Sequence, residues 1–371
     1  MRAVKVLVVK MSSMGDIVHA QPLAADILAR HPDAAIDWVC EAAFAAIPAL
    51  NPAVASVIPI RLRAWRRQPG AAATRAAVRA FLARLRATRY DLVIDCQGLV
   101  KSALVVRLAR ARQRVGLSWG SAREPVASWA YDLRAQVPWS LHVVARNRAV
   151  GAAALGRPVE GPARFGLRAP TLAADWLPQR RYAVLIPGAS RAAKLWPEAD
   201  WLAVAAGLAN RGLALVWLWG TPEERARVAR LAAAAGDWVD ASACDVRRAA
   251  PETTQGAPAA QACDTAAAGR GLSVVPPFLS VAEAAGLLDG AQAVVGLDTG
   301  LTHLAGALGR PTVGIFCDFD AVQCAVSGDG PCESLGGVGV RPPAGHVNEA
   351  IGRVLDANRS APSPETATAQ H

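Results

Sequence analysis

Short apolar runs alternate with helical segments rich in Ala, Leu and Arg along most of the chain, and this alternation limits the possible folds more than any other feature. The runs are Val4 to Val9, Ile36 to Val39, Leu92 to Ile94, Ala183 to Ile186, Leu213 to Leu218 and Ala293 to Gly296. Strands that alternate with helices pair in parallel. Since 371 residues exceed one average domain, we expect an α/β fold with two parallel sheets.

The region from Gly156 to Gln179 interrupts this alternation. It contains Pro158, Pro162, Pro170 and Pro178, and a new strand is expected from Tyr182. We therefore predict four parts: a Rossmann-like N-terminal domain over 1–160, a linker over 161–180, a Rossmann-like C-terminal domain over 181–345, and a C-terminal helix with a disordered tail over 346–371. The stretch 241–270 is rich in Ala, Thr, Gln and Pro and is expected to be a surface insertion.

The composition narrows the class of protein. Hydrophobic residues make up 53% and charged residues 19% of the chain, which is enough apolar material for two packed cores. The formal net charge of +10 indicates a polyanionic partner: a nucleic acid, a phosphorylated substrate or an anionic membrane surface. The sequence has no helix-turn-helix, zinc-finger or RNA-binding signature, so we do not expect nucleic acid to be the partner.

The seven cysteines do not predict a disulfide framework or a metal site. They are scattered, odd in number and include no Cys-x-x-Cys pair. The amino terminus lacks a signal-peptide cleavage site, and no segment reaches the ~18 apolar residues that a membrane-spanning helix needs. We therefore expect a cytoplasmic protein with at most a peripheral contact with the membrane.

The loop after the first strand carries the most informative acidic residue. Here Val4 to Val9 is followed by Lys10-Met-Ser-Ser-Met-Gly-Asp16. Ligands of open α/β sheets bind beyond the carboxyl ends of the strands, and Gly15 would let the backbone turn closely there. Asp16 is therefore a candidate general base. The alternative is that Ser12, Ser13 or Asp16 only caps the following helix.

Two loops of the second half suit a phosphorylated ligand. Pro187 to Pro197 contains hydroxyl, guanidinium and ammonium groups, and Asp298 to His303 begins a helix whose free N–H groups can hold phosphate oxygens. The simpler interpretation is that Asp298 or Thr299 caps this helix and that His303 is a packed histidine of its first turn.

Several motifs, in this order, resemble one known family. They include Lys10-x-Ser-Ser-Met-Gly-Asp-x-x-His19, Asp91-x-Val-Ile-Asp-x-Gln-Gly-Leu-Val-Lys-Ser102, Lys194-x-Trp-Pro197 and Asp298-Thr-Gly-Leu-x-His303. The chain resembles the lipopolysaccharide heptosyltransferases of glycosyltransferase family 9 over nearly its whole length. Within the family it is similar to the members that add the first heptose to the Kdo of Kdo-lipid A. The resemblance implies a GT-B fold, with two Rossmann-like domains whose parallel sheets face a central cleft.

The resemblance also implies a reaction and its residues. The reaction is inverting transfer of L-glycero-D-manno-heptose from ADP-heptose, with Asp16 as the catalytic base, no cofactor beyond this co-substrate and no obligatory metal. Donor contacts are expected from Ser190, Arg191, Lys194, Glu224, Leu279, Asp298, Thr299, Gly300 and His303. Acceptor contacts are expected from Ser13, Gly15, Arg63, Arg66, Arg67, Gln97, Lys101, Arg123 and His142.

The basic run Arg61 to Arg67 would also attract the protein to the anionic inner leaflet of the cytoplasmic membrane, although a solvated loop is the simpler interpretation. Trp65 and Trp119 are expected either to face the lipid or the sugar, or to be buried. The loop Phe316 to Ala321 departs from the family pattern.

Two other functions stay open: addition of a later heptose, and a nucleotide-sugar-binding regulator without activity.

Overall fold

The computed structural model describes residues 3–241 and 272–360, and its contacts divide the chain into two compact units, Met1–Arg168 and Ala169–His371. The division falls inside the segment 161–180 that was predicted to be a linker. Most of the expected insertion, and the tail from 361 to 371, lie outside the described residues.

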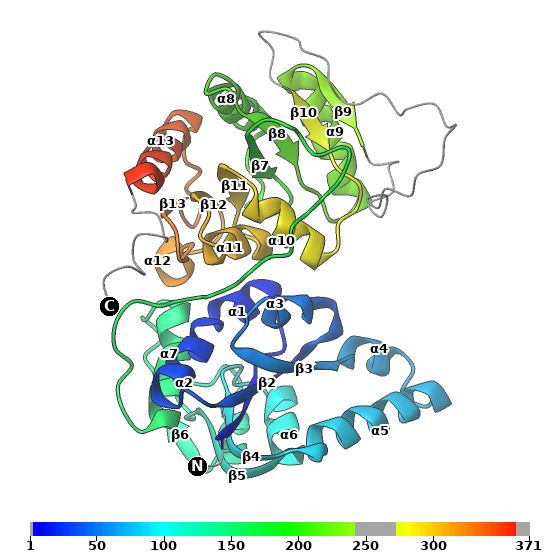
Figure 1. The fold of residues 1–371 in the computed structure, drawn as a ribbon, viewed down its shortest axis with the longest axis vertical. Helices are drawn as coiled ribbons and strands as arrows, with labels where there is room; N and C mark the ends of the chain where they lie inside the picture. The colour runs from blue at the N-terminus through cyan, green and yellow to red at the C-terminus, as the bar shows by residue number, and fades with distance from the viewer. Residues whose placement is uncertain (1–2, 242–271, 361–371) are drawn as a thin grey trace. The chain divides into compact units, whose positions relative to one another are not determined.

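Unit 1 contains one parallel sheet of six strands (Figure 1). The strands are β1 (Lys5–Val9), β2 (Ala35–Glu41), β3 (Val54–Ile60), β4 (Arg89–Asp95), β5 (Arg110–Leu117) and β6 (Leu133–Ala135). Their order across the sheet is β3-β2-β1-β4-β5-β6. This is the strand order of a Rossmann fold, in which the direction of winding reverses between β1 and β4.

Helices cover both faces of this sheet. They are α1 (Met14–His19), α2 (Pro22–Arg30), α3 (Ala46–Ala49), α4 (Leu62–Arg67), α5 (Ala72–Ala87), α6 (Val100–Leu108) and α7 (Val143–Leu155), with the 3₁₀ helices η1 (Ala42–Phe44) and η2 (Pro125–Ala130). Leu7 and Val9 belong to a core cluster with Phe81 and Leu85 of α5, while Val6 and Val8 are equally buried outside that cluster. Because both faces of the sheet are covered, β1 reads as a continuous apolar run from Val6 to Val9.

Unit 2 repeats this architecture with seven parallel strands. They are β7 (Tyr182–Ile186), β8 (Ala214–Trp217), β9 (Trp238–Asp240), β10 (Ser273–Val275), β11 (Ala293–Leu297), β12 (Thr312–Phe316) and β13 (Cys332–Gly336). Their order is β13-β12-β11-β7-β8-β10-β9, so the winding reverses between β7 and β11.

The helices of unit 2 are η3 (Ala192–Lys194), α8 (Glu198–Ala209), α9 (Pro222–Ala235), α10 (Val281–Asp289), α11 (Gly300–Ala307), α12 (Ala321–Cys324) and α13 (Ala344–Ser360). One core cluster joins the sheet to α8, α9 and α13, and Trp196 and Trp201 meet edge to face within it at 5.3 Å between ring centroids. The predicted fold class, two parallel Rossmann-like α/β domains, is confirmed.

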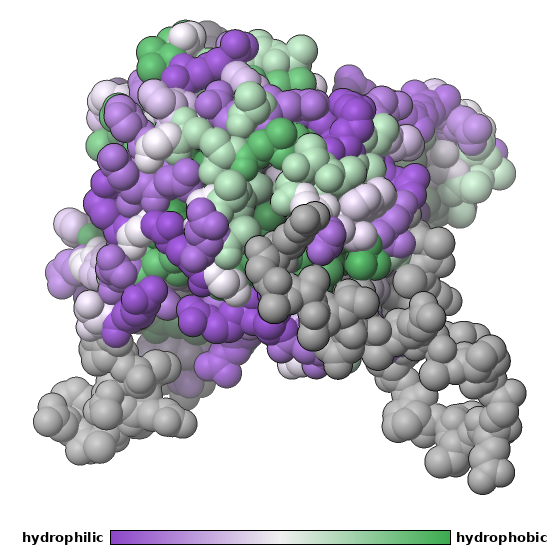
Figure 2. Space-filling model, turned by 90° about the horizontal axis from the view of Figure 1, so that it is seen from above, coloured by the Kyte–Doolittle hydropathy of each residue, from purple (hydrophilic) through white to green (hydrophobic). Residues whose placement is uncertain are grey.

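Among the described residues, no helix combines the length and the apolar character needed to cross a membrane. The face seen in Figure 2 has hydrophobic side chains in its middle and hydrophilic side chains around them.

Candidate functional site

Several of the predicted site residues follow the strands at the reversal point of each sheet. In unit 1, Asp16 lies at the start of α1, which follows β1, and Gln97 lies in the loop that follows β4. In unit 2, the loops that follow β7 and β11 carry Lys194 and Asp298. Because the crevice at this point of a parallel sheet is where α/β proteins bind ligands, the topology of each unit supports the residues chosen from the sequence.

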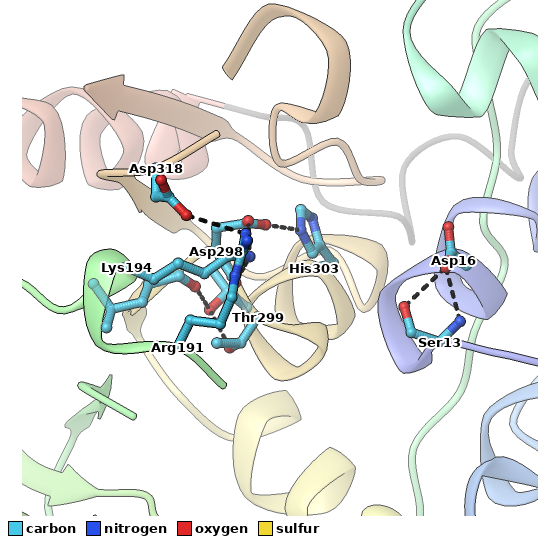
Figure 3. A network of polar contacts seen from close by, with 10 residues as sticks. Ser13, Asp16, Arg191, Lys194, Asp298, Thr299, His303 and Asp318 are labelled. Atoms are coloured by element: carbon cyan, nitrogen blue, oxygen red, sulfur yellow. Dashed lines mark hydrogen bonds and ion pairs between the residues drawn. The ribbon is translucent and has the colours of Figure 1, made fainter. Parts of the chain in front are cut away.

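Asp16 lies in the first turn of α1, where one of its carboxylate oxygens is occupied. Its Oδ2 accepts hydrogen bonds from the Ser13 backbone N–H at 2.7 Å and from the Ser13 hydroxyl at 2.9 Å (Figure 3). Its Oδ1 has no hydrogen-bond partner in the described parts of the chain. The capping alternative is therefore correct for Oδ2, and the same contacts orient Oδ1. Gly15 lies within this helix and does not adopt a positive φ, so the expected glycine-dependent turn is wrong.

Gln97 and Lys101 hold the loop that leads to Asp16. The Gln97 side-chain oxygen accepts from the backbone N–H groups of Met11 (2.8 Å) and Ser12 (3.2 Å), and its Nε2 donates to the Ser12 carbonyl at 2.6 Å. The Lys101 ammonium donates to the Ser12 hydroxyl at 3.0 Å. These contacts give both residues a role in positioning the loop, in addition to the acceptor contacts expected of them.

Asp95, the last residue of β4, holds the start of the loop that contains Gln97, and it was not among the predicted site residues. The carboxylate is fully buried, accepts from the Gln97 N–H at 2.7 Å and from the Tyr131 hydroxyl at 2.7 Å, and its pKa is raised by burial. Its position at the end of a strand, like that of Asp16 after β1, was the sequence signal that could have identified Asp95.

Cys96, the next residue, is a buried thiol whose pKa is raised by burial to about 12, as expected for an unreactive cysteine.

The other predicted acceptor residues lie on separate elements of unit 1. Arg63, Arg66 and Arg67 are exposed on α4, so the run is solvated, as the simpler interpretation had it, but it forms a helix and not a loop. Arg123 is exposed in the segment before η2. His142 caps α7, and its Nδ1 accepts from the Val144 N–H at 3.3 Å.

Trp65 and Trp119 differ in their burial. Trp65 packs edge to face against Phe81, with ring centroids 5.7 Å apart, and its indole nitrogen is buried. Trp119 is 53% exposed. Of these two side chains, only that of Trp119 is exposed enough to contact another molecule.

In unit 2, Lys194, Asp298 and His303 form a connected group of polar contacts. The Lys194 ammonium donates to the Asp298 carboxylate and, at 3.3 Å, to its backbone carbonyl, and the His303 Nε2 lies 3.2 Å from Asp298 Oδ1 (Figure 3). The three side chains are 15%, 11% and 3% exposed. Since an ammonium has three N–H donors, one donor of Lys194 is left for an anion.

Two opposing effects act on the Asp298 carboxyl. Burial alone would raise its pKa, but the hydrogen bonds from His303 and Lys194, and the electrostatic interaction with both groups, outweigh burial and hold the pKa below its usual value. Asp298 is therefore an anion at neutral pH, and it fixes the positions of the cation and the imidazole beside it.

Thr299 is the N-cap of α11, and Gly300 is its first residue. The Thr299 hydroxyl makes no capping bond to the helix backbone and lies 3.3 Å from the Thr302 hydroxyl. His303 is buried in the first turn of this helix, as the simpler interpretation expected, and it also contacts Asp298.

Ser190 and Arg191 are exposed in the loop after β7. The Arg191 guanidinium pairs with Asp318 at 3.1 Å. Asp318 lies in the Phe316 to Ala321 loop after β12 and was not expected to contribute. Its place just beyond the end of an apolar strand was the available signal.

Glu224 is more constrained than a solvated helix residue. Its Oε2 accepts from the Gly220 N–H at 2.7 Å, and a Cβ atom on Gly188 would lie 2.5 Å from its carboxylate. Because Gly188 has no side chain, its backbone can approach Glu224 closely. Leu279 is half-buried and directly precedes Ser280, the N-cap of α10.

Comparison with known proteins identifies a family. The chain matches glycosyltransferase family 9 (heptosyltransferase) over residues 78–244 and 249–329. It is 38% identical over 313 residues to lipopolysaccharide heptosyltransferase 1 of Pseudomonas aeruginosa, which covers 84% of this chain and 78% of that protein.

Two solved structures agree. The E. coli heptosyltransferase WaaC with ADP is 32% identical, with a TM-score of 0.75, and the match covers 94% of this chain and 99% of that one. The same enzyme with ADP-2-deoxy-2-fluoro heptose is 31% identical, with a TM-score of 0.72 and the same coverage. This chain is therefore a glycosyltransferase with the GT-B fold, and it belongs to glycosyltransferase family 9, among the heptosyltransferases of lipopolysaccharide core synthesis.

Proposed function

We propose that the chain transfers L-glycero-D-manno-heptose from ADP-heptose to the Kdo of Kdo-lipid A, with inversion at the anomeric carbon. The observation that carries the proposal is the geometry of Asp16, whose Oδ2 is fixed by Ser13 while Oδ1 has no partner among the described residues. WaaC structures that contain ADP and an ADP-heptose analogue support the donor.

In this mechanism Asp16 Oδ1 accepts the proton of the attacking Kdo hydroxyl while the anomeric carbon gains oxocarbenium character. The bond from that carbon to the diphosphate oxygen breaks, and ADP leaves. Because ADP is a stable anion, no general acid is required. The remaining N–H donor of Lys194 and the start of α11 at Thr299 and Gly300 would stabilise the charge that develops on the diphosphate.

The other donor residues receive roles that follow from their positions. Glu224, held against Gly188 and Gly220, would bind the ribose hydroxyls. Asp298 and His303 would contact the heptose, and Ser190, Arg191 and Leu279 would line the rest of the donor site.

The acceptor carries a Kdo carboxylate and lipid A phosphates, which suit arginine and lysine. We assign its charged groups to Arg63, Arg66 and Arg67 of α4, with Lys101 and Arg123. Ser13, Gly15, Gln97 and His142 would line the sugar site. The protein would act peripherally on the cytoplasmic face of the inner membrane.

The test is transfer by the purified protein, followed as ADP release from ADP-heptose with and without Kdo-lipid A. Release that depends on Kdo-lipid A supports the proposal. Release only with an acceptor that already carries heptose would indicate a later heptosyltransferase, and donor binding without release under any condition would indicate a regulator.

The donor site should work without a bound metal, because Lys194 and the helix start supply the positive charge near the diphosphate. We expect full activity after treatment with EDTA and no further gain with Mg²⁺, measured as initial rates of ADP release. Loss of activity in EDTA that Mg²⁺ restores would contradict this prediction.

The double variant Arg66→Ala/Arg67→Ala should raise the KM for Kdo-lipid A by about 10-fold or more, because charge-assisted hydrogen bonds contribute about 1.5–3 kcal/mol each. The KM for ADP-heptose should not change. Arg79→Ala, which removes an exposed arginine of α5 in the same unit, is the matched control. Equal KM values for the double variant and this control would exclude α4 from acceptor binding.

A further inference from the structure

Unit 1 has an exposed apolar surface for which neither its core nor the transfer reaction accounts. Its members are the large apolar side chains that are at least half exposed on η2, α6 and the segments near them: Trp119, Trp129, Trp139, Val126, Val100 and Leu104. The three tryptophans are 53%, 70% and 52% exposed. Single exposed apolar residues are normal, but a contiguous group marks an interaction site. We call this group the tryptophan surface.

The side chains are held in place and adjoin one another. The rings of Trp119 and Trp129 are 6.0 Å apart between centroids. The Trp139 indole N–H donates to the Gly120 carbonyl at 3.0 Å, and its ring lies 3.9 Å from the Arg146 guanidinium. These contacts order the tryptophans in an exposed position, so little conformational entropy would be lost when a partner covers them.

The apolar residues of α6 belong to the same surface. Helix α6 packs against η2, which carries Val126 and Trp129. The Val100 N–H donates to the Glu124 carboxylate at 2.7 Å, directly before η2 begins. Leu104 follows Val100 by one helical turn and therefore lies on the same side of α6.

Arginines border the tryptophan surface. Arg134 donates to the Ser128 carbonyl at 2.9 Å, and Arg146 donates to the carbonyls of Pro138 and Ser121. Neither these two nor Arg123 pairs with a carboxylate within residues 3–241 and 272–360. An apolar centre rich in tryptophan with a cationic border complements the interface of an anionic lipid leaflet.

A second copy of the chain is a poorer partner for this surface. In a two-fold symmetric dimer each patch would face its own equivalent. The arginines would then approach arginines, which is unfavourable. The charge pattern therefore favours a lipid partner.

The tryptophan surface adjoins the candidate catalytic loop. Val100 precedes Lys101, whose ammonium donates to the Ser12 hydroxyl in the loop that leads to Asp16. A leaflet that contacted Val100 and Leu104 would therefore lie beside this loop, where a lipid-linked acceptor has to present its sugar.

We propose that the tryptophan surface inserts into the anionic leaflet that holds the acceptor, so that α6 and η2 set the depth at which unit 1 meets the lipid. This inference rests on the proposed function only in taking the acceptor to be a lipid. It assigns insertion to residues other than the basic helix α4, which in the proposed function would contact the charged groups of the acceptor.

The test uses the double variant Trp119→Ala/Trp129→Ala, with Trp238→Ala as the control, because Trp238 is an exposed tryptophan of β9 in unit 2. Binding is measured by co-sedimentation with phosphatidylglycerol/phosphatidylcholine vesicles. We expect at least a 10-fold loss of vesicle binding for the double variant and none for the control. Unchanged binding of the double variant would overturn the inference.

Two activity assays separate this inference from the proposed function. With Kdo-lipid A in vesicles, kcat/KM of the double variant should fall at least 10-fold; with a deacylated, water-soluble Kdo acceptor it should stay within about twofold of the wild type. An equal loss with both acceptors would assign the tryptophans to the sugar site or the fold and overturn leaflet insertion. Loss of a dimer in sedimentation velocity would assign them to self-association instead. If the wild type transfers to neither acceptor but its vesicle binding still depends on the tryptophans, the proposed function fails and the inference stands.

Discussion

Asp16→Ala should lower turnover by about 10² to 10⁴-fold, which is the contribution of a positioned general base. Asp16→Asn should have a similar effect, because the amide has nearly the same shape as the carboxylate but cannot accept the proton of the acceptor hydroxyl. The asparagine oxygen can still accept the hydrogen bond that the Ser13 N–H makes to Asp16 Oδ2 in the wild type. The asparagine variant therefore separates the chemical role of Asp16 from its role at the start of α1.

The measurement is the rate of ADP release at saturating ADP-heptose and Kdo-lipid A, with donor affinity determined separately by calorimetry. Donor affinity should stay near the wild-type value. Asp33→Asn, which changes an exposed aspartate of unit 1, is the matched control and should leave the rate unchanged. If Asp16→Asn kept near-normal turnover, the carboxylate would be a helix cap only.

The sheets could be predicted from the sequence where the strands are buried on both faces. The strands Lys5–Val9 and Tyr182–Ile186 lie in the middle of their sheets, and they read as apolar runs from Val6 to Val9 and over the whole of Tyr182–Ile186. Strand β5 was missed because it reads Arg-Ala-Arg-Gln-Arg-Val-Gly-Leu, and only its last three residues pair with β6. Its first residues are largely exposed, so the usual apolar signal is absent.

The candidate site was predictable as a set of loops but not as a set of contacts. An acid after a buried strand drew attention to Asp16 and Asp298, and the same pattern marks Asp95 and Asp318, which were not chosen. Which side chains meet depends on strand order. Lys194 and Asp298 are 104 residues apart and pair because β7 lies next to β11. No local pattern contains that information.

Lys194→Ala should lower kcat by about 10² to 10³-fold, because a preorganised donor aimed at developing charge contributes this much to the rate. In the wild type the Lys194 ammonium uses two donors on Asp298, which fix its position before the substrate binds. Without this ammonium the charge on the departing diphosphate would lose one of the cations proposed to stabilise it. ADP affinity should also fall, since the product carries the same diphosphate.

The same substitution should raise the pKa of Asp298. Burial of this carboxyl remains, while one of the two groups that hold its pKa below the usual value is removed. A depressed carboxyl pKa stabilises the folded state above the unfolded-state pKa, and this stabilisation is lost as the pH falls through the folded-state pKa. The variant should therefore lose part of its stability at neutral pH, with less further loss on acidification than the wild type, measured by thermal unfolding from pH 7 to pH 3.

Arg230→Ala is the matched control, because it removes an exposed ion pair to Glu198 in the same unit. Such a pair contributes little to stability, and both kcat and the unfolding profile should match the wild type. Lys194→Ala could instead change the unfolding profile and leave kcat and ADP affinity intact. Lys194 would then only neutralise the charge of the buried Asp298 carboxylate, and the start of α11 would have to stabilise the charge on the diphosphate.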